Sequence, residues 1–254
     1  TIVVSEHRLY FLNGIADRIV LMEHGKLKQS WSARDFALLS TEQIKALGLR
    51  SYTPARLELP ETMPSRNDTP AVEVKDLAIG YEKGKPVAQH LNFRVYPGEI
   101  VGVVGKNGCG KSTLLKTLCK LVLPSNGAVY LNNKDIHKYP SKALAKNLGL
   151  MPQSPIVPEG ITVADLVARG RFPYRQPLKG MSKEDYQIVS EAMDMMGISD
   201  LADRCVDELS GGQRQRVWLA LALAQDTDIL LLDEPTTFLD ISYQIEILDL
   251  LTEL

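Results

Sequence analysis

The chain has 254 residues, of which 44% are hydrophobic and 24% are charged, a composition typical of a soluble globular protein with room for one large domain or two smaller ones. Its formal net charge of −2 provides no global basic field of the kind that attracts nucleic acid. No apolar run approaches the length of a membrane span and no signal peptide is visible, while the cysteines show no disulfide or metal spacing and fit a reducing cytosol.

The first part of the chain predicts several small elements. Residues 1–4 (TIVV) and 18–23 read as apolar strands, and a tight turn at His24-Gly25 follows the second. Residues 8–16 fit a short helix, and residues 32–47 carry two short helical patterns. Because the chain opens inside an expected strand and Thr1 is not an initiator methionine, we expect the sequence to be a fragment of a longer protein.

A polar stretch separates this part from the rest. Prolines punctuate residues 53–70, which predicts an extended linker. From Ala71 onward short strands alternate with helical patterns, and this order argues for an α/β layer with a mostly parallel sheet. The expected strands include 72–77, 91–95, 100–104 and 128–131, and residues 162–205 are mostly helical with a loop at 170–180.

Residues 105–112 read GKNGCGKS, between an apolar strand pattern and a helical one. The glycines let the backbone curl so that its N–H groups face inward, and the helix that opens near Lys111 adds the positive end of its dipole. The pattern predicts a phosphate-binding loop in which Lys111 reaches the β- and γ-phosphates of ATP and Ser112 ligates Mg²⁺. The residues expected to contact the nucleotide here are Gly105, Asn107, Gly108, Cys109, Gly110, Lys111, Ser112 and Thr113.

Two interpretations of Cys109 stay open. It lies near a helix N-terminus, where the pKa of a thiol tends to fall, or it is simply a small residue in a tight loop. Cys119 and Cys205 are expected to be small core residues.

Residues 229–234 read ILLLDE, a buried strand with two carboxylates at its C-terminal end. This is the end at which α/β sheets place their ligand sites. We expect Asp233 to hold the hydration shell of Mg²⁺ and Glu234 to act as general base on the attacking water. The alternative, an exposed pair that caps a helix, fits poorly beside a phosphate loop.

Residues 209–216 read LSGGQRQR and precede an apolar helical stretch. Ser210, Gly211 and Gly212 would open that helix with free N–H groups, which makes a second anion site, and Gln213 belongs to the same motif. One chain does not need two such sites for one triphosphate. The motif resembles the signature sequence of the ATP-binding-cassette (ABC) family, which implies a nucleotide-sandwich dimer: the signature of one ABC ATPase domain closes over ATP held by the loop of its partner.

The resemblance extends to other positions. Gln153 matches the glutamine that contacts Mg²⁺ and the attacking water, Tyr81 matches the aromatic residue that stacks on adenine, and Asp240 matches an aspartate at the dimer interface. For Tyr81 a half-buried strand tyrosine remains the alternative. The resemblance implies an α/β P-loop NTPase with a mostly parallel core sheet, an antiparallel β subdomain and an α-helical signature subdomain over residues 71–254.

The body lacks the histidine that the family places after the helix following Glu234, yet residues 3–7 (VVSEH) resemble that switch strand and offer His7. Residues 1–52 therefore resemble the C-terminal piece of a preceding ABC ATPase domain of the energy-coupling-factor type. The chain is then a cut from a tandem protein, or residues 1–30 complete the body's own sheet as in a circular permutant. Since an apolar strand is costly to leave in water, we expect residues 1–4 to dock beside the strand of Leu230–Leu232.

Residues 161–185 resemble the helical region of ATPases that drive importers of iron siderophores, haem and cobalamin, whereas the N-terminal piece suggests vitamins or metal ions. The resemblance implies an ATP-hydrolysing subunit that energises transport of such a solute through integral membrane subunits, on the cytoplasmic face of the cell membrane, with no nucleic acid partner. The alternative is a soluble ABC ATPase that acts on ribosomes or DNA. The linker is short and proline-rich, unlike the long charged helical linker of ribosome-acting members, and the chain shows no long coiled-coil insertion of the kind that DNA-acting members carry.

Overall fold

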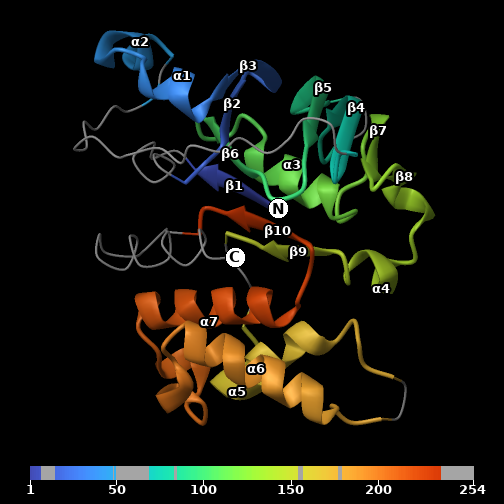
Figure 1. Cartoon of the computed structure of the whole chain (residues 1–254), viewed down its shortest axis with the longest axis vertical. Helices are drawn as coiled ribbons and strands as arrows, with labels where there is room; N and C mark the ends of the chain where they lie inside the picture. The colour runs from blue at the N-terminus through green and yellow to red at the C-terminus, as the bar shows by residue number, and fades with distance from the viewer. Residues whose placement is uncertain are drawn as a thin grey trace.

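The computed structural model describes residues 1–6, 15–47, 49, 69–82, 85–153, 157–176 and 179–235. Two sheets and a layer of helices make up this part of the chain (Figure 1). The expected switch residue His7, the interface residue Asp240 and most of the proline-rich linker lie outside the described residues.

The larger sheet has six strands in the order β3-β2-β6-β1-β10-β9. All neighbours in it are parallel except the antiparallel hairpin of β2 and β3. The expected mostly parallel core sheet is therefore confirmed. Its strands are β1 (Ile2–Glu6), β2 (Arg18–Glu23), β3 (Lys26–Ser32), β6 (Ile100–Gly105), β9 (Leu148–Met151) and β10 (Ile229–Asp233).

Strand β1 is the first in sequence but lies in the middle of this sheet. It pairs in parallel with β10, with Ile2 opposite Leu230 and Val4 opposite Leu232, and on its other side with β6. Ile2, Val3 and Val4 are all buried, as the apolar pattern requires of a strand covered on both faces. The docking expected for residues 1–4 is thus found.

The smaller sheet is antiparallel, in the order β5-β4-β7-β8, and confirms the expected antiparallel subdomain. Its first strands alternate buried and exposed residues only in part, because bulges interrupt the pairing of β4 with both neighbours. Its strands are β4 (Val72–Ile79), β5 (Ala88–Val95), β7 (Asn126–Leu131) and β8 (Lys134–Asp135).

Helices cover both faces of the six-stranded sheet. Val3 and Leu231 belong to one apolar core with residues of α3 (Lys111–Leu118). Val4 and Leu232 belong to a second core with α5 (Val163–Ala168), α6 (Lys183–Met195) and α7 (Gly211–Ala224). Neighbouring residues of a strand point to opposite faces, so α3 and α7 lie on opposite sides of the sheet, as Figure 1 also shows. The expected helical subdomain is confirmed.

Apart from α6 with 13 residues and α7 with 14, the remaining helices are short. The two helical patterns expected within residues 32–47 are confirmed as α1 and α2. Helical bounds are α1 (Ala33–Ala37), α2 (Thr41–Ala46), α4 (Ser141–Leu144), α5 (Val163–Ala168), α6 (Lys183–Met195) and α7 (Gly211–Ala224), with 3-10 turns η2 (Ile136–Lys138), η3 (Arg169–Arg171), η4 (Ser199–Leu201) and η5 (Val206–Glu208).

Candidate nucleotide-binding and hydrolysis site

The glycine-rich loop runs from the end of β6 to the start of α3. Gly110 has φ +104°, a conformation that side chains rarely adopt. A Cβ atom on Gly105 would stand 2.3 Å from the carbonyl oxygen of Met22 on β2. Lys111 is 5% exposed, and its Nζ donates hydrogen bonds to the carbonyl oxygens of Gly105 at 2.9 Å and Lys106 at 3.3 Å. The lysine therefore lies inside the curl of the loop.

The other loop residues occupy the positions that the motif predicts. Gly108 has φ +80°, Asn107 is exposed, and Thr113 is buried in the first turn of α3. Cys109 is buried as well, and burial raises the pKa of its thiol although the nearby Lys111 acts in the opposite direction. Of the two interpretations of Cys109, the lowered thiol pKa is therefore wrong, because desolvation outweighs the helix end and the lysine, and the small residue in a tight loop is the one that fits.

The first carboxylate of the pair meets the loop directly. The hydroxyl of Ser112 donates a hydrogen bond of 3.1 Å to Oδ1 of Asp233, at the C-terminal end of β10. Asp233 is 2% exposed. Burial raises the pKa of its carboxyl, and the hydrogen bond from Ser112 partly offsets this. The acidic end of β10 and the phosphate loop therefore lie together at the C-terminal ends of the parallel strands.

The second carboxylate, Glu234, is the residue directly after Asp233 and the end of β10. Its Oε2 accepts a hydrogen bond of 2.7 Å from Nε2 of Gln153, which comes shortly after β9. Glu234 adopts a left-handed backbone with φ +50°, and its N–H donates to the carbonyl oxygen of Ser5 on β1 at 3.0 Å. The structure thus joins Gln153 and Glu234, two residues that the sequence analysis assigned to the same reaction.

Tyr81 lies next to the helix of the phosphate loop. Its ring is 64% exposed and it follows the end of β4. The ammonium group of Lys116 on α3 lies 5.9 Å from the ring centroid and 3.4 Å from the hydroxyl. The alternative of a half-buried strand tyrosine is therefore wrong, and an exposed aromatic face stands beside the loop.

The signature motif forms the start of α7. Ser210 and Gln213 cap each other: the hydroxyl of Ser210 accepts from the N–H of Gln213 at 3.2 Å, and Oε1 of Gln213 accepts from the N–H of Ser210 at 3.1 Å. The expectation that the N–H of Ser210 is free is therefore wrong. Gly211 and Gly212 lie in the first turn. Since α7 and α3 cover opposite faces of the sheet, the signature motif at the start of α7 does not lie over the phosphate loop of the same chain.

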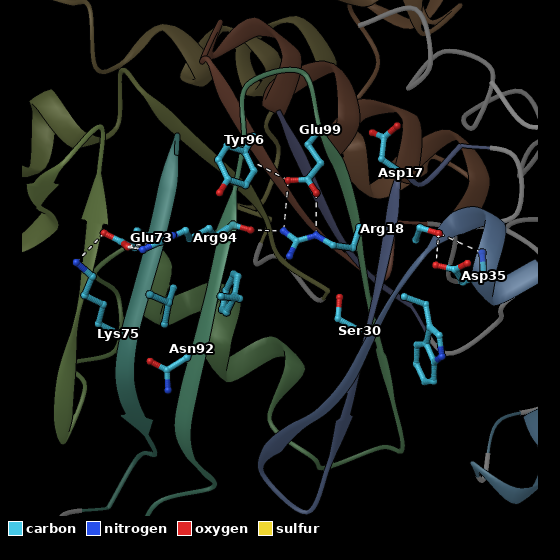
Figure 2. Close-up of a pocket in the computed structure, with 14 residues that line it drawn as sticks. Asp17, Arg18, Ser30, Asp35, Glu73, Lys75, Asn92, Arg94, Tyr96 and Glu99 are labelled. Atoms are coloured by element: carbon cyan, nitrogen blue, oxygen red, sulfur yellow. Dashed lines mark hydrogen bonds and ion pairs between the residues drawn. The ribbon is translucent and has the colours of Figure 1, made fainter. Parts of the chain in front are cut away.

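A cleft of about 810 Å³ lies elsewhere, between the β2–β3 hairpin and the antiparallel sheet. Figure 2 shows that some of its charged side chains are bonded to one another. Arg18 pairs with Glu99 at 2.7 Å, and Glu73 accepts from both Lys75 and Arg94. Those bonds hold the pKa of the Glu73 carboxyl below its usual range, Lys75 contributing most. The sequence analysis missed these pairs: Arg18–Glu99 and Arg94–Glu73 join segments that only the sheets bring together, whereas Lys75 and Glu73 lie two residues apart on β4.

A glycine loop between a parallel strand and a helix, with an acidic pair at a neighbouring strand end, defines a P-loop nucleoside triphosphatase. A family model described as ABC transporter matches residues 88–237. The chain belongs to this family, and the resemblance of the core motifs is confirmed.

Named relatives and solved structures agree with this assignment. YusV of Bacillus subtilis, named as a probable siderophore transport system ATP-binding protein, is 52% identical over 72% of this chain and 66% of its own length. The achromobactin transport ATP-binding protein CbrD of Dickeya dadantii is 50% identical over 72% and 68%, and the ferric enterobactin transport ATP-binding protein FepC of Escherichia coli is 50% identical over 71% and 66%.

Among solved structures, an inward-facing metal-chelate type ABC transporter is 34% identical with a TM-score of 0.61, covering 73% of this chain and 68% of its own. The structure of cbiO1 from Clostridium perfringens, part of the transporter complex cbiONQ, is 29% identical with a TM-score of 0.61, covering 73% and 74%. The chain spans about two thirds of the length of the curated relatives just named. Within its described residues, no helix is long and apolar enough to cross a bilayer.

Proposed function

We propose that this chain is an ATP-hydrolysing subunit that energises transport of a small solute across a membrane through partner membrane subunits. The observation that carries the proposal is the meeting of two pairs at one edge of the sheet: Ser112 with Asp233, and Gln153 with Glu234. The first pair belongs to phosphate and metal binding, and the second to activation of water. The relatives are named as ATP-binding proteins of transport systems, and this supports the coupling of hydrolysis to transport.

The phosphate chain of ATP would bind along the loop backbone. Lys111 now donates to two loop carbonyls, and these donors can turn to the β- and γ-phosphates, whose negative charge makes a stronger acceptor. The exposed ring of Tyr81 would stack on adenine beside the same helix. From a partner domain, the start of α7 with Ser210, Gly211, Gly212 and Gln213 would close over the γ-phosphate.

Oxygen groups suited to Mg²⁺ are present in this site. The Ser112 hydroxyl and the Asp233 carboxylate lie 3.1 Å apart, and the side-chain amide of Gln153 lies on the same edge through Glu234. These few groups suit Mg²⁺, which usually binds to one or two protein groups together with waters and substrate phosphates. When bound, Mg²⁺ would neutralise charge that develops on the phosphates.

Hydrolysis needs a group that orients water and accepts its proton. Glu234 takes the proton from a water whose oxygen attacks the γ-phosphorus, while the bond to the leaving ADP oxygen breaks. Gln153 holds the carboxylate by its hydrogen bond. The switch role proposed for His7 concerns a residue outside the described part of the chain.

Domain organisation and partners follow as part of the proposal. Residues 1–52 are the C-terminal piece of a preceding ABC ATPase domain, residues 53–70 a linker, and residues 71–254 an ABC ATPase domain. The partners are a second ABC ATPase domain in a nucleotide-sandwich dimer and integral membrane subunits, at the cytoplasmic face of the cell membrane. Since α7 and α3 lie on opposite faces of the sheet, one chain alone does not complete a sandwiched site.

The solute is an iron chelate, cobalamin, a vitamin or a metal ion, and the relatives named for siderophores favour the iron chelate. Those relatives give no support to the alternative, a soluble ABC ATPase acting on ribosomes or DNA. Phosphate release from MgATP tests the catalytic part of the proposal, and co-purification of the tagged chain with membrane subunits tests the coupling. Co-purification with ribosomes instead, or a chain that binds no ATP, would refute the corresponding part.

A further inference from the structure

A polar residue interrupts the apolar strand β1 at the point where it passes the acidic pair. Ser5 follows Ile2, Val3 and Val4, which pack into the two cores, and it is 0% exposed. In register it stands opposite Asp233 on β10 and opposite Val103 on β6. A serine at this depth has no access to water, so its hydroxyl must be satisfied by a protein group or remain unbonded.

The backbone of Ser5 already fixes one of the two carboxylates. Its carbonyl oxygen accepts the N–H of Glu234 at 3.0 Å. Glu234 has φ +50°, a conformation that is unfavourable for a residue with a side chain and persists where neighbours hold it. The hydrogen bond to β1 is therefore part of what keeps the general base in its turn after β10.

Ser5 also stands directly opposite the other carboxylate, Asp233, in the register of the two parallel strands. The hydroxyl of Ser5 nevertheless has no hydrogen-bond partner among the described residues. We take the geometry to mean that the hydroxyl is close to Asp233 but not yet aligned with it. Ser112 supplies the one aligned hydroxyl donor, to Oδ1.

We propose that Ser5 is a positioning residue of the nucleotide site, whose hydroxyl turns to Asp233 as a second hydrogen-bond donor when Mg²⁺ and nucleotide bind, while its carbonyl holds Glu234. The inference rests on the proposed function. A buried carboxylate with two donors keeps one orientation, and an oriented oxygen binds a cation at lower cost than one that must first reorganise. Ser5 itself contacts neither nucleotide nor metal.

The experiment measures the Mg²⁺ concentration that half-saturates binding of a fluorescent ATP analogue, and separately the affinity for that analogue without Mg²⁺. For Ser5→Ala we expect the Mg²⁺ requirement to rise roughly tenfold, since a hydrogen bond to a charged group is lost, with Mg²⁺-free affinity unchanged. Ser5→Thr keeps the hydroxyl and should restore the requirement.

Thr117→Val is the matched control. Thr117 is also 0% exposed, and its hydroxyl bonds to the carbonyl oxygen of Thr113 rather than to a carboxylate. This variant should lose stability without changing the Mg²⁺ requirement. An unchanged requirement in Ser5→Ala, or an equal change in Thr117→Val, overturns the inference and leaves the proposed function standing. A wild-type chain that binds no nucleotide overturns both.

Discussion

Gln153 and Glu234 are joined by a hydrogen bond of 2.7 Å from Nε2 of the glutamine to Oε2 of the glutamate. The two residues follow strands β9 and β10, which are parallel neighbours in the sheet. Because the C-terminal ends of parallel strands lie on the same side of a sheet, the amide can orient the carboxylate without any long-range rearrangement. A candidate base and its orienting group thus lie just after two adjacent strands.

Glu234→Gln should keep ATP binding and lose turnover. The amide preserves the size of the side chain but cannot accept a proton from water, and loss of a general base costs about 100-fold or more. Phosphate release and binding of a fluorescent ATP analogue measure the two effects separately. Gln153→Ala, which leaves the carboxylate in place, should cost less. Near-normal hydrolysis by Glu234→Gln in a complete protein would remove Glu234 from the role of base.

Lys111→Ala should weaken nucleotide binding itself. The ammonium group lies inside the loop, within hydrogen-bond reach of two carbonyl oxygens, and its removal deletes the only side-chain cation that we assign to the phosphates. We expect the dissociation constant for MgATP to rise at least about tenfold, because charge-assisted hydrogen bonds are the strong ones. Isothermal titration measures it, and an unchanged constant would contradict the binding mode.

Gly105→Ala should destabilise the fold. The added Cβ would stand 2.3 Å from the carbonyl oxygen of Met22 and 2.8 Å from Sγ of Cys109, so either the loop or β2 has to move. We expect a loss of about 2 kcal/mol in the free energy of unfolding, the range of overpacked sites. Gly180→Ala is the control, because nothing lies within 4 Å of its Cβ position. Equal urea midpoints for the two variants would contradict the close approach.

Arg18→Ala should destabilise the fold more than the partly exposed position of Arg18 suggests. The guanidinium pairs with Glu99 at 2.7 Å, and the glutamate side chain is only 8% exposed. The variant leaves that carboxylate buried without its partner, which costs about 3 kcal/mol. Lys85→Ala breaks the exposed pair with Glu82 and should cost less than about 1 kcal/mol. Chemical unfolding compares them, and similar losses would disprove the prediction.

Asp185→Asn should destabilise the helical layer in a pH-dependent way. Asp185 pairs with the buried Arg171 at 2.8 Å, and that hydrogen bond holds the pKa of the Asp185 carboxyl below its usual value. The pair therefore adds stability above the unfolded-state pKa of about 3.9, and the gain is lost as the pH falls through the folded-state pKa. Urea unfolding should show a gap between wild type and variant at neutral pH that closes below about pH 4. A gap independent of pH would contradict this.

The sequence by itself determined the chemistry that we propose for the site. The glycine loop, the acidic end of β10 and the start of α7 are each contiguous patterns, in which spacing and residue type already dictate local backbone and charge. That is why Lys111, Ser112, Asp233 and Glu234 could be assigned before any coordinates, and why the ABC family was recognised from its motifs. The motif left two interpretations of Cys109 open, and the burial of its side chain, which depends on the packing around the loop, decided against a lowered thiol pKa.

Only the tertiary structure decided which distant segments meet. The pairing of β1 with β10 was expected from the sequence, but the structure alone placed β6 on the other side of β1, brought the Ser5 carbonyl to Glu234, set Met22 against Gly105 and paired Arg18 with Glu99. None of these contacts has a periodic or local signal, because strand order in a parallel sheet is set by the burial of all strands together. Hydrophobic patterning says that a strand must be buried, but which neighbours bury it follows from the packing of the whole sheet.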